Sequence, residues 1–197
     1  MILSAFLVLI AYLLGSISSA VVVSRIMGLP DPRTMGSGNP GATNVLRTGS
    51  KKAAAITLLG DALKGLIPVL LAKFLGADQN VIALVAIAAF LGHLFPIFFG
   101  FKGGKGVATA LGVFLAVSYP VGLMLAGSWL VIAYVTKISS ISALIAACLS
   151  PFYISYVTDE PVYIAMAVFM SVFLVYRHKS NIRDLISGKE GKITDED

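Results

Sequence analysis

The chain has 197 residues, of which 57% are hydrophobic and 13% are charged, and its mean hydropathy is +0.90. Soluble domains carry about 25% charged residues, so this composition excludes an ordinary water-soluble protein and indicates an integral membrane protein. The single cysteine, Cys148, excludes an internal disulfide, and two distant histidines without other soft ligands nearby predict no metal site.

The N-terminal segment, MILSAFLVLIAYLLGSISSAVVVSR, lacks the basic region of a signal peptide, and its apolar run is too long for one. It therefore predicts a first membrane helix over about residues 2–23. Further apolar segments follow at about 53–75, 81–99, 106–118, 120–136, 138–157 and 161–176. Residues 106–136 carry no charge and include Pro120. As one helix they would measure about 46 Å, too long for one span and too short for two full ones.

Basic residues collect in alternate connections between these segments. Seven spans put every basic connection on one side of the membrane, as the positive-inside rule requires, whereas six would leave the basic C-terminus outside. We therefore predict an all-α integral membrane protein with seven transmembrane helices, an outside N-terminus and a cytoplasmic C-terminus, in which the fourth and fifth helices are short or tilted. The basic connections hold Arg25, Arg33, Arg47, Lys51, Lys52, Lys102, Lys105, Lys137, Arg177, Lys179, Arg183, Lys189 and Lys192, and the opposite ones hold Asp78, Asp159 and Glu160, with Lys73 near a helix end.

The first cytoplasmic connection contains SGNPGATNVLRT, from Ser37 to Thr48. Gly38 and Gly41 allow successive backbone N–H groups to converge on an oxyanion. Short polar donors and the planar guanidinium of Arg47 suit a phosphate; the donors are Ser37, Thr43 and Asn44. The alternative is a juxtamembrane loop whose basic residues contact only lipid head groups, which does not explain the glycines and asparagines.

The next cytoplasmic connection contains GFKGGKG, from Gly100 to Gly106. It is not a Walker A loop, because Lys105 is followed by glycine rather than by serine or threonine. Glycines and a lysine at the start of a helix still predict an anion site, since the first helical N–H groups are free and the dipole is positive there. The alternative is a glycine-rich turn with a snorkelling lysine.

The last connection, RHKSNIRD, supplies His178, Ser180 and Asn181. His178 is a candidate general base, phosphate donor or plain interfacial histidine. His93, near the cytoplasmic end of the third span, either lines the same pocket or bonds a neighbouring helix. In the second span, Asp61 and Lys64 are three residues apart on one helical face. Because buried charges are costly unless paired, we expect these two to pair, either as a helix lock or as support beneath the site.

At these positions the chain resembles the bacterial acyl-phosphate-dependent glycerol-3-phosphate acyltransferases, the PlsY family. The resemblance covers nearly the whole chain, and the matching motifs are GSGNPGATNVLRTGS, GDALKG, GHLFPIFFGFKGGKG and HKSNIRDLISGKE. It implies that the 1-hydroxyl of glycerol 3-phosphate attacks the carbonyl of a fatty acyl phosphate, giving lysophosphatidic acid and inorganic phosphate. Acyl-CoA and acyl carrier protein are not direct donors, and no cofactor is needed.

The resemblance also implies roles for individual residues. Side chains that would hold glycerol 3-phosphate are Ser37, Arg47, Lys105, His178 and Asn181, with Ser142 as a weaker match. Backbone N–H groups of two loops would hold the acyl phosphate and its developing oxyanion; these loops comprise Gly38, Asn39, Gly41, Ala42, Thr43 and Asn44, and Gly103 and Gly104.

The cytoplasmic motifs contain no carboxylate that is an obvious base. Since an acyl phosphate is already an activated anhydride, positioning can supply most of the catalysis. We favour a substrate phosphate oxygen as the proton acceptor with His178 as a binder, and His178 as the general base is the second choice.

A phosphate or organophosphate transporter is the alternative from another class, but it predicts internal repeats, which are not visible. A purely structural subunit leaves the anion loops unexplained.

We expect one transmembrane domain over 1–197 with a loose tail from about 187. We expect a monomer in the bacterial inner membrane with its site on the cytoplasmic face. Membrane lipid is an expected partner and nucleic acid is not.

Overall fold

The computed structural model describes residues 1–48 and 50–193 of the chain. In that part it contains ten α-helices, one 3-10 helix and no β-strand, which confirms the all-α prediction. In chain order the helices are α1 (Ile2–Gly15), α2 (Ser19–Ile26), α3 (Ala42–Arg47), α4 (Lys51–Phe74), α5 (Gln79–Leu94), η1 (Ile97–Phe99), α6 (Val107–Val117), α7 (Tyr119–Thr136), α8 (Ser139–Thr158), α9 (Pro161–Arg177) and α10 (Lys179–Ile186).

Within the described residues, four helical segments are long and apolar enough to cross a membrane, namely α4, α5 with η1, α7 and α8. Two bent pairs pass the same test, α1 with α2 (bent by 46°) and α9 with α10 (58°), which raises the number of candidate spans to six.

The apolar run 106–136 divides at Ser118 into α6 and α7. At 11 residues, α6 is about 16 Å long, so it is shorter than a hydrocarbon core of about 30 Å.

The first apolar segment differs from the prediction, because one continuous helix over residues 2–23 is wrong. The helix stops after Gly15 and restarts at Ser19. Ser16 donates its hydroxyl to the carbonyl of Tyr12 at 2.8 Å, and the carbonyl of Ile17 accepts from Lys64 Nζ at 2.7 Å. A buried ammonium from α4 therefore satisfies a carbonyl at the break, which an apolar environment requires.

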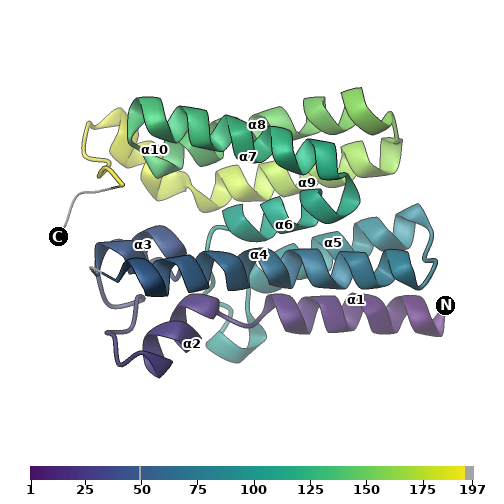
Figure 1. Ribbon diagram of the computed structural model, residues 1–197, viewed down its shortest axis with the longest axis horizontal. Coiled ribbons are helices and arrows are strands. Elements are labelled where there is room, and N and C mark those ends of the chain that lie inside the picture. The colour runs from purple at the N-terminus through teal and green to yellow at the C-terminus, as the bar shows by residue number, and fades with distance from the viewer. Residues whose placement is uncertain (49, 194–197) are drawn as a thin grey trace.

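Figure 1 shows the long helices side by side, with the N-terminus at one end of the bundle and α2, α3 and α10 at the other. We call this second end the loop end.

Glycines let the helices approach closely. A Cβ on Gly92 would lie 2.3 Å from the carbonyl oxygen of Tyr12, and one on Gly112 would lie 2.0 Å from that of Ala62. Backbone contact of this kind is the usual way to pack helices in lipid, and it fixes α5 against α1 and α6 against α4. These backbone contacts leave the four helices little room to shift against one another.

Candidate active site

A cavity of about 990 Å³ opens at the loop end and extends between α4, α6, α7, α8 and α9. Its polar end is lined by side chains from the three cytoplasmic connections singled out in the sequence, namely Ser37, Asn39, Thr43, Asn44, Arg47, Lys105, His178, Ser180 and Asn181. Further in, the wall becomes apolar, with Leu58, Leu111, Phe114, Leu125, Trp129, Met170 and Leu174. One cavity thus joins a cationic mouth to an apolar channel.

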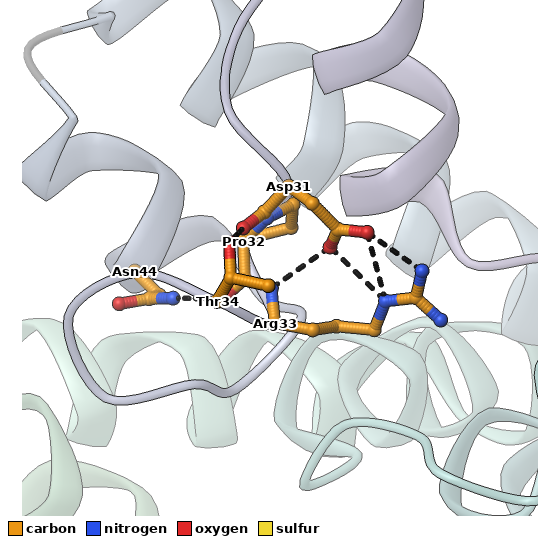
Figure 2. A network of polar contacts seen from close by, with 5 residues as sticks. All are labelled: Asp31, Pro32, Arg33, Thr34 and Asn44. Atoms are coloured by element: carbon orange, nitrogen blue, oxygen red, sulfur yellow. Dashed lines mark hydrogen bonds and ion pairs between the residues drawn. The ribbon is translucent and has the colours of Figure 1, made fainter.

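The loop before α3 is organised by Asn44 (Figure 2). Its amide nitrogen donates to the carbonyls of Pro32 (2.7 Å) and Met35 (3.1 Å), and its side-chain oxygen accepts from the N–H of Ser37 at 3.0 Å. Asn44 is buried, and both amide hydrogens are used in these bonds. It therefore shapes the loop that presents Ser37, rather than offering a free donor as the sequence suggested.

The glycine N–H groups of this loop are also engaged. Gly38, at φ +66°, donates to the carbonyl of Met35 at 2.9 Å, and Gly41 donates to that of Asn39 at 2.9 Å. Gly38 does not line the cavity, whereas Ala42 and Thr43, the first residues of α3, do. Because the first N–H groups of a helix lack intrahelical acceptors, the amides of Ala42 and Thr43 are better placed for an anion than the glycine amides.

Arg47 ends α3 and lines the cavity. Its Nη2 donates to the carbonyl of Lys192 at 3.2 Å, while its Nε is buried and has no hydrogen-bond partner among the described residues. Four other buried polar atoms of cavity-lining residues have no hydrogen-bond partner among the described residues, namely Ser140 Oγ, Trp129 Nε1, His93 Nδ1 and Asp61 Oδ1. Of these, Asp61 Oδ1 has an ion pair with Lys64. Unsatisfied buried donors are unusual in native proteins, so the cavity wall is suited to a polar ligand.

The loop from Gly100 to Gly106 places Lys105 in the cavity, but not Gly103 or Gly104. The N–H of Gly104 donates to the carbonyl of His93 at 3.1 Å, so this amide is not available to an acyl phosphate as predicted. Lys105 Nζ donates to Asn181 Oδ1. Burial lowers the pKa of Lys105, and the Glu190 carboxylate offsets this effect only in part.

His178 is the residue between α9 and α10, and its ring is buried. Its Nδ1 lies 2.8 Å from the carbonyl of Leu174. Burial lowers the pKa of His178 to about 4 despite that hydrogen bond, and the charges of Lys105 and Arg177 act in the same direction as burial. The ring is therefore neutral at pH 7. Since a carbonyl can only accept, Nδ1 carries the proton and Nε2 presents a lone pair.

The C-terminal segment differs from the loose tail predicted from about residue 187. Lys189, Glu190, Gly191 and Ile193 line the cavity mouth. Asn181 Nδ2 donates to Glu190 Oε1 at 2.7 Å, and the N–H of Ile193 donates to the carbonyl of Lys137 at 2.8 Å. Polar contacts with α10 and the α7–α8 turn hold this segment; residues 194–197 lie outside the described part. The carboxylate of Glu190 thus lies beside Asn181, a contact that the sequence analysis did not predict.

The sequence placed Ser142 in the site, but Ser142 does not line the cavity. Its hydroxyl donates to the carbonyl of Ile138 at 3.0 Å within α8, and the residue is fully buried. Ser139 and Ser140 line the cavity instead. Ser139 Oγ lies 3.2 Å from Thr43 Oγ1, which ties α8 to α3.

The expected Asp61–Lys64 ion pair is present, with Lys64 Nζ 2.8 Å from Asp61 Oδ1 and both side chains buried. His93 Nδ1 lies 3.7 Å from the same oxygen. Asp61 and His93 line the cavity, so His93 does face the pocket. Among the described residues, no group of three or more histidines, cysteines or acids could hold a metal ion.

The model of the family described as "Glycerol-3-phosphate acyltransferase" matches residues 5–188. A glycerol-3-phosphate acyltransferase of Thioalkalivibrio sulfidiphilus is 58% identical over 193 residues, covering 98% of this chain and 95% of that protein. One from Methylococcus capsulatus is 56% identical, covering 93% and 92% of the two chains. The chain belongs to the glycerol-3-phosphate acyltransferase family. It is an integral membrane acyltransferase, as the resemblance implied, and the transporter alternative is not favoured.

Solved structures support the same assignment. The glycerol 3-phosphate form of PlsY (YgiH), an integral membrane glycerol 3-phosphate acyltransferase, superposes with a TM-score of 0.92 at 42% identity and covers 96% of this chain and 94% of its own. The lysophosphatidic acid form superposes with a TM-score of 0.90 at 40% identity. The helices of this acyltransferase therefore have the PlsY arrangement.

Two contacts of the site were missed from sequence, those of Arg177 and Glu190. Arg177 had been counted only as a basic residue for topology, and Glu190 only as part of a polar tail. Arg177 directly precedes the matched stretch HKSNIRDLISGKE and Glu190 ends it. The resemblance over this stretch was the signal that could have pointed to them. Their partners, however, lie 73 and 9 residues away along the chain, and sequence alone does not reveal such pairings.

Proposed function

We propose that this enzyme transfers a fatty acyl group from acyl phosphate to the 1-hydroxyl of glycerol 3-phosphate, giving lysophosphatidic acid and inorganic phosphate. The observation that carries the proposal is the single cavity that joins a cationic mouth, with Arg47 and Lys105, to an apolar channel. Two phosphate-bearing reactants need cations and free donors, and a fatty chain needs apolar walls. Acyl-CoA would bring the same fatty chain, so the choice of acyl phosphate as the donor rests on the family resemblance.

The depth of the channel suits one long acyl chain. Along α8, the lining residues extend from Ser139 to Ser150, which is about 16 Å at a rise of about 1.5 Å per residue. Half of a hydrocarbon core of about 30 Å is nearly the same length. A chain of the kind found in one membrane leaflet would therefore fit with its carbonyl near the mouth.

At the mouth, we infer that Ser37, Arg47, Lys105, His178 and Asn181 hold glycerol 3-phosphate. Arg47 offers a forked donor and Lys105 a point charge, the two usual ways to bind a phosphate. The amides of Ala42 and Thr43 would receive the acyl phosphate, with Ser139 and Ser140 taking the place predicted for Ser142. Asn39, Asn44 and the glycines of both loops then act by shaping the backbone.

In the reaction, the 1-hydroxyl oxygen bonds to the acyl carbonyl carbon, the bond from that carbon to the phosphate oxygen breaks, and phosphate leaves. The hydroxyl proton goes to a phosphate oxygen of a substrate, with His178 as a binder. The neutral ring of His178, with Nδ1 directed at Leu174, can accept a hydrogen bond from a substrate hydroxyl through Nε2. This same lone pair is what a general base would use, so His178 as base stays the second choice.

We infer seven spans, with the N-terminus outside, the C-terminus cytoplasmic and the site on the cytoplasmic face of the inner membrane. Counting each bent pair once and α6 as a short span gives an odd number, and α10 lies at the opposite end of the bundle from the N-terminus (Figure 1). The loop end also carries the basic connections. We infer one domain that acts as a monomer, because both the cationic mouth and the apolar channel are built within a single copy of the chain.

The experiment uses purified full-length protein in detergent with glycerol 3-phosphate and palmitoyl phosphate, following release of inorganic phosphate and formation of lysophosphatidic acid. Both products should form in equal amounts, and palmitoyl-CoA in place of palmitoyl phosphate should give little product. Comparable rates with palmitoyl-CoA alone would refute the donor assignment. Phosphate release without lysophosphatidic acid would mean hydrolysis rather than transfer.

A further inference from the structure

We propose that Arg177 is a positioning residue, which fixes the Gly103–Gly104 backbone so that Lys105 is held at a set distance from His178. The inference deepens the proposed function and rests on its assignment of Lys105 and His178 to one substrate, glycerol 3-phosphate. It concerns a residue that does not itself line the cavity, so its effect on the reaction must pass through its neighbours.

The guanidinium of Arg177 grips two consecutive peptide groups. Its Nη2 donates to the carbonyl of Gly103 at 2.6 Å and its Nε donates to the carbonyl of Gly104 at 3.1 Å. The guanidinium carbon also lies 5.7 Å from the centre of the Phe95 ring, so the group is flanked by an aromatic face. Only a planar fork can span two carbonyls in this way, and the residue that follows the gripped pair is Lys105.

His93 holds the same two residues from another direction. Its carbonyl accepts from the N–H of Gly104, and a Cβ on Gly104 would lie 2.2 Å from its Nε2. A Cβ on Gly103 would lie 2.1 Å from the His93 carbonyl oxygen. The dipeptide therefore lies between the end of α5 and the end of α9, with no room for a side chain and with three hydrogen bonds to keep it there.

Arg177 is the last residue of α9, and this position links the clamp to His178. It directly precedes His178, so the end of α9 holds the loop of Lys105 and the following residue supplies the His178 ring. Lys105 in turn donates to Asn181 in the first turn of α10. Three groups assigned to glycerol 3-phosphate, those of Lys105, His178 and Asn181, are thus held relative to one another by one arginine that does not itself line the cavity.

A double-mutant cycle tests this role. Arg177→Lys keeps the charge but cannot bridge two carbonyls, so kcat/KM for glycerol 3-phosphate should fall about tenfold or more, the size expected for lost charged hydrogen bonds. In a Lys105→Ala background, Arg177→Lys should lower kcat/KM by less than about twofold, because the group being positioned is absent. Arg183→Lys, an exposed arginine of α10, is the matched control and should behave as the wild type.

Guanidinium ion added to Arg177→Ala should restore part of the lost turnover, which it cannot do for a variant that is merely unfolded. Equal losses from Arg177→Lys in the wild-type and Lys105→Ala backgrounds would refute the inference while leaving the phosphate contact of Lys105 intact. A wild-type kcat/KM in Lys105→Ala alone would refute the contact itself, and the positioning role with it. A fall in thermal stability of Arg177→Lys that accounts for the whole loss of activity would also overturn the proposal.

Discussion

Removal of one charge from the buried Asp61–Lys64 pair should destabilise the bundle far more than removal of an equivalent exposed lysine. Lys64→Ala deletes the 2.8 Å ion pair and the 2.7 Å hydrogen bond to the carbonyl of Ile17. The carboxylate of Asp61 then stays buried with only His93 nearby, at 3.7 Å. Leaving one buried charge of a pair uncompensated costs about 3–5 kcal/mol.

Asp61→Ala should cost less, because the ammonium of Lys64 still has the carbonyl of Ile17 as an acceptor. The double variant should fall short of the sum of the two single losses by about 1 kcal/mol or more, because no orphaned charge remains. A chain of this size loses about 2–4 °C of Tm per kcal/mol, so Lys64→Ala should lower Tm by about 6–20 °C.

The assay is thermal unfolding of the detergent-solubilised protein at one fixed scan rate, because irreversible unfolding makes Tm depend on that rate. Lys73→Ala is the matched control, since Lys73 lies on the same helix but is exposed and donates only to the carbonyls of Ala116 and Val117. Additive losses in the double variant, or a Lys64→Ala loss no larger than that of the control, would refute the reasoning.

Arg47→Lys should raise the KM for glycerol 3-phosphate with little change in kcat, since the charge stays but the fork is lost; an unchanged KM would contradict the phosphate contact. His178→Asn should keep measurable turnover at saturating substrate, and a variant that binds normally but does not turn over would make His178 the base. Because the folded pKa of His178 is about 4, its neutral form is present above that pH and lost only as the pH falls through it, so the plot of kcat/KM against pH should show no histidine step near the reference value of about 6.5. Cysteines placed at Gln79 and Ser187 should react with impermeant reagent from outside and from the cytoplasm, respectively, and outside labelling at Ser187 would contradict seven spans.

The helical segments were predictable because a bilayer leaves the backbone few choices. Every N–H and carbonyl in lipid needs an internal partner, so an apolar run of sufficient length becomes a helix. The predicted segments 53–75 and 138–157 accordingly match α4 (Lys51–Phe74) and α8 (Ser139–Thr158) within two residues. The break after Gly15 was not predictable in the same way. Apolar residues lie on both sides of it, and Lys64, which satisfies the carbonyl of Ile17, comes from another helix.

The sequence predicted that the polar motifs gather at one end of the bundle, but it did not predict which partner each donor would bond to. Gly104 and Asn44 both matched a substrate-binding pattern, and both use their N–H groups to hold their own loops. Ser142 and Ser140 are two residues apart, so they face different sides of α8, and it is Ser140 that faces the cavity. A sequence shows which groups are available; their direction depends on contacts made across the fold.

Because these donors hold the loops rather than a substrate, they bear on how the proposed reaction is catalysed. The charges assigned to the phosphates, Arg47 and Lys105, come from two separately held segments. Arg47 ends α3, whose Asn44 holds the preceding loop, and Lys105 follows the clamped pair Gly103 and Gly104. An acyl phosphate needs little activation, so the demand on the protein is to bring a hydroxyl and a carbonyl together in the right geometry. Backbone-anchored loops meet that demand better than long side chains on a mobile surface would. Gly103 and Gly104, which looked like direct phosphate ligands, instead let their loop pack against His93 closely enough to be held.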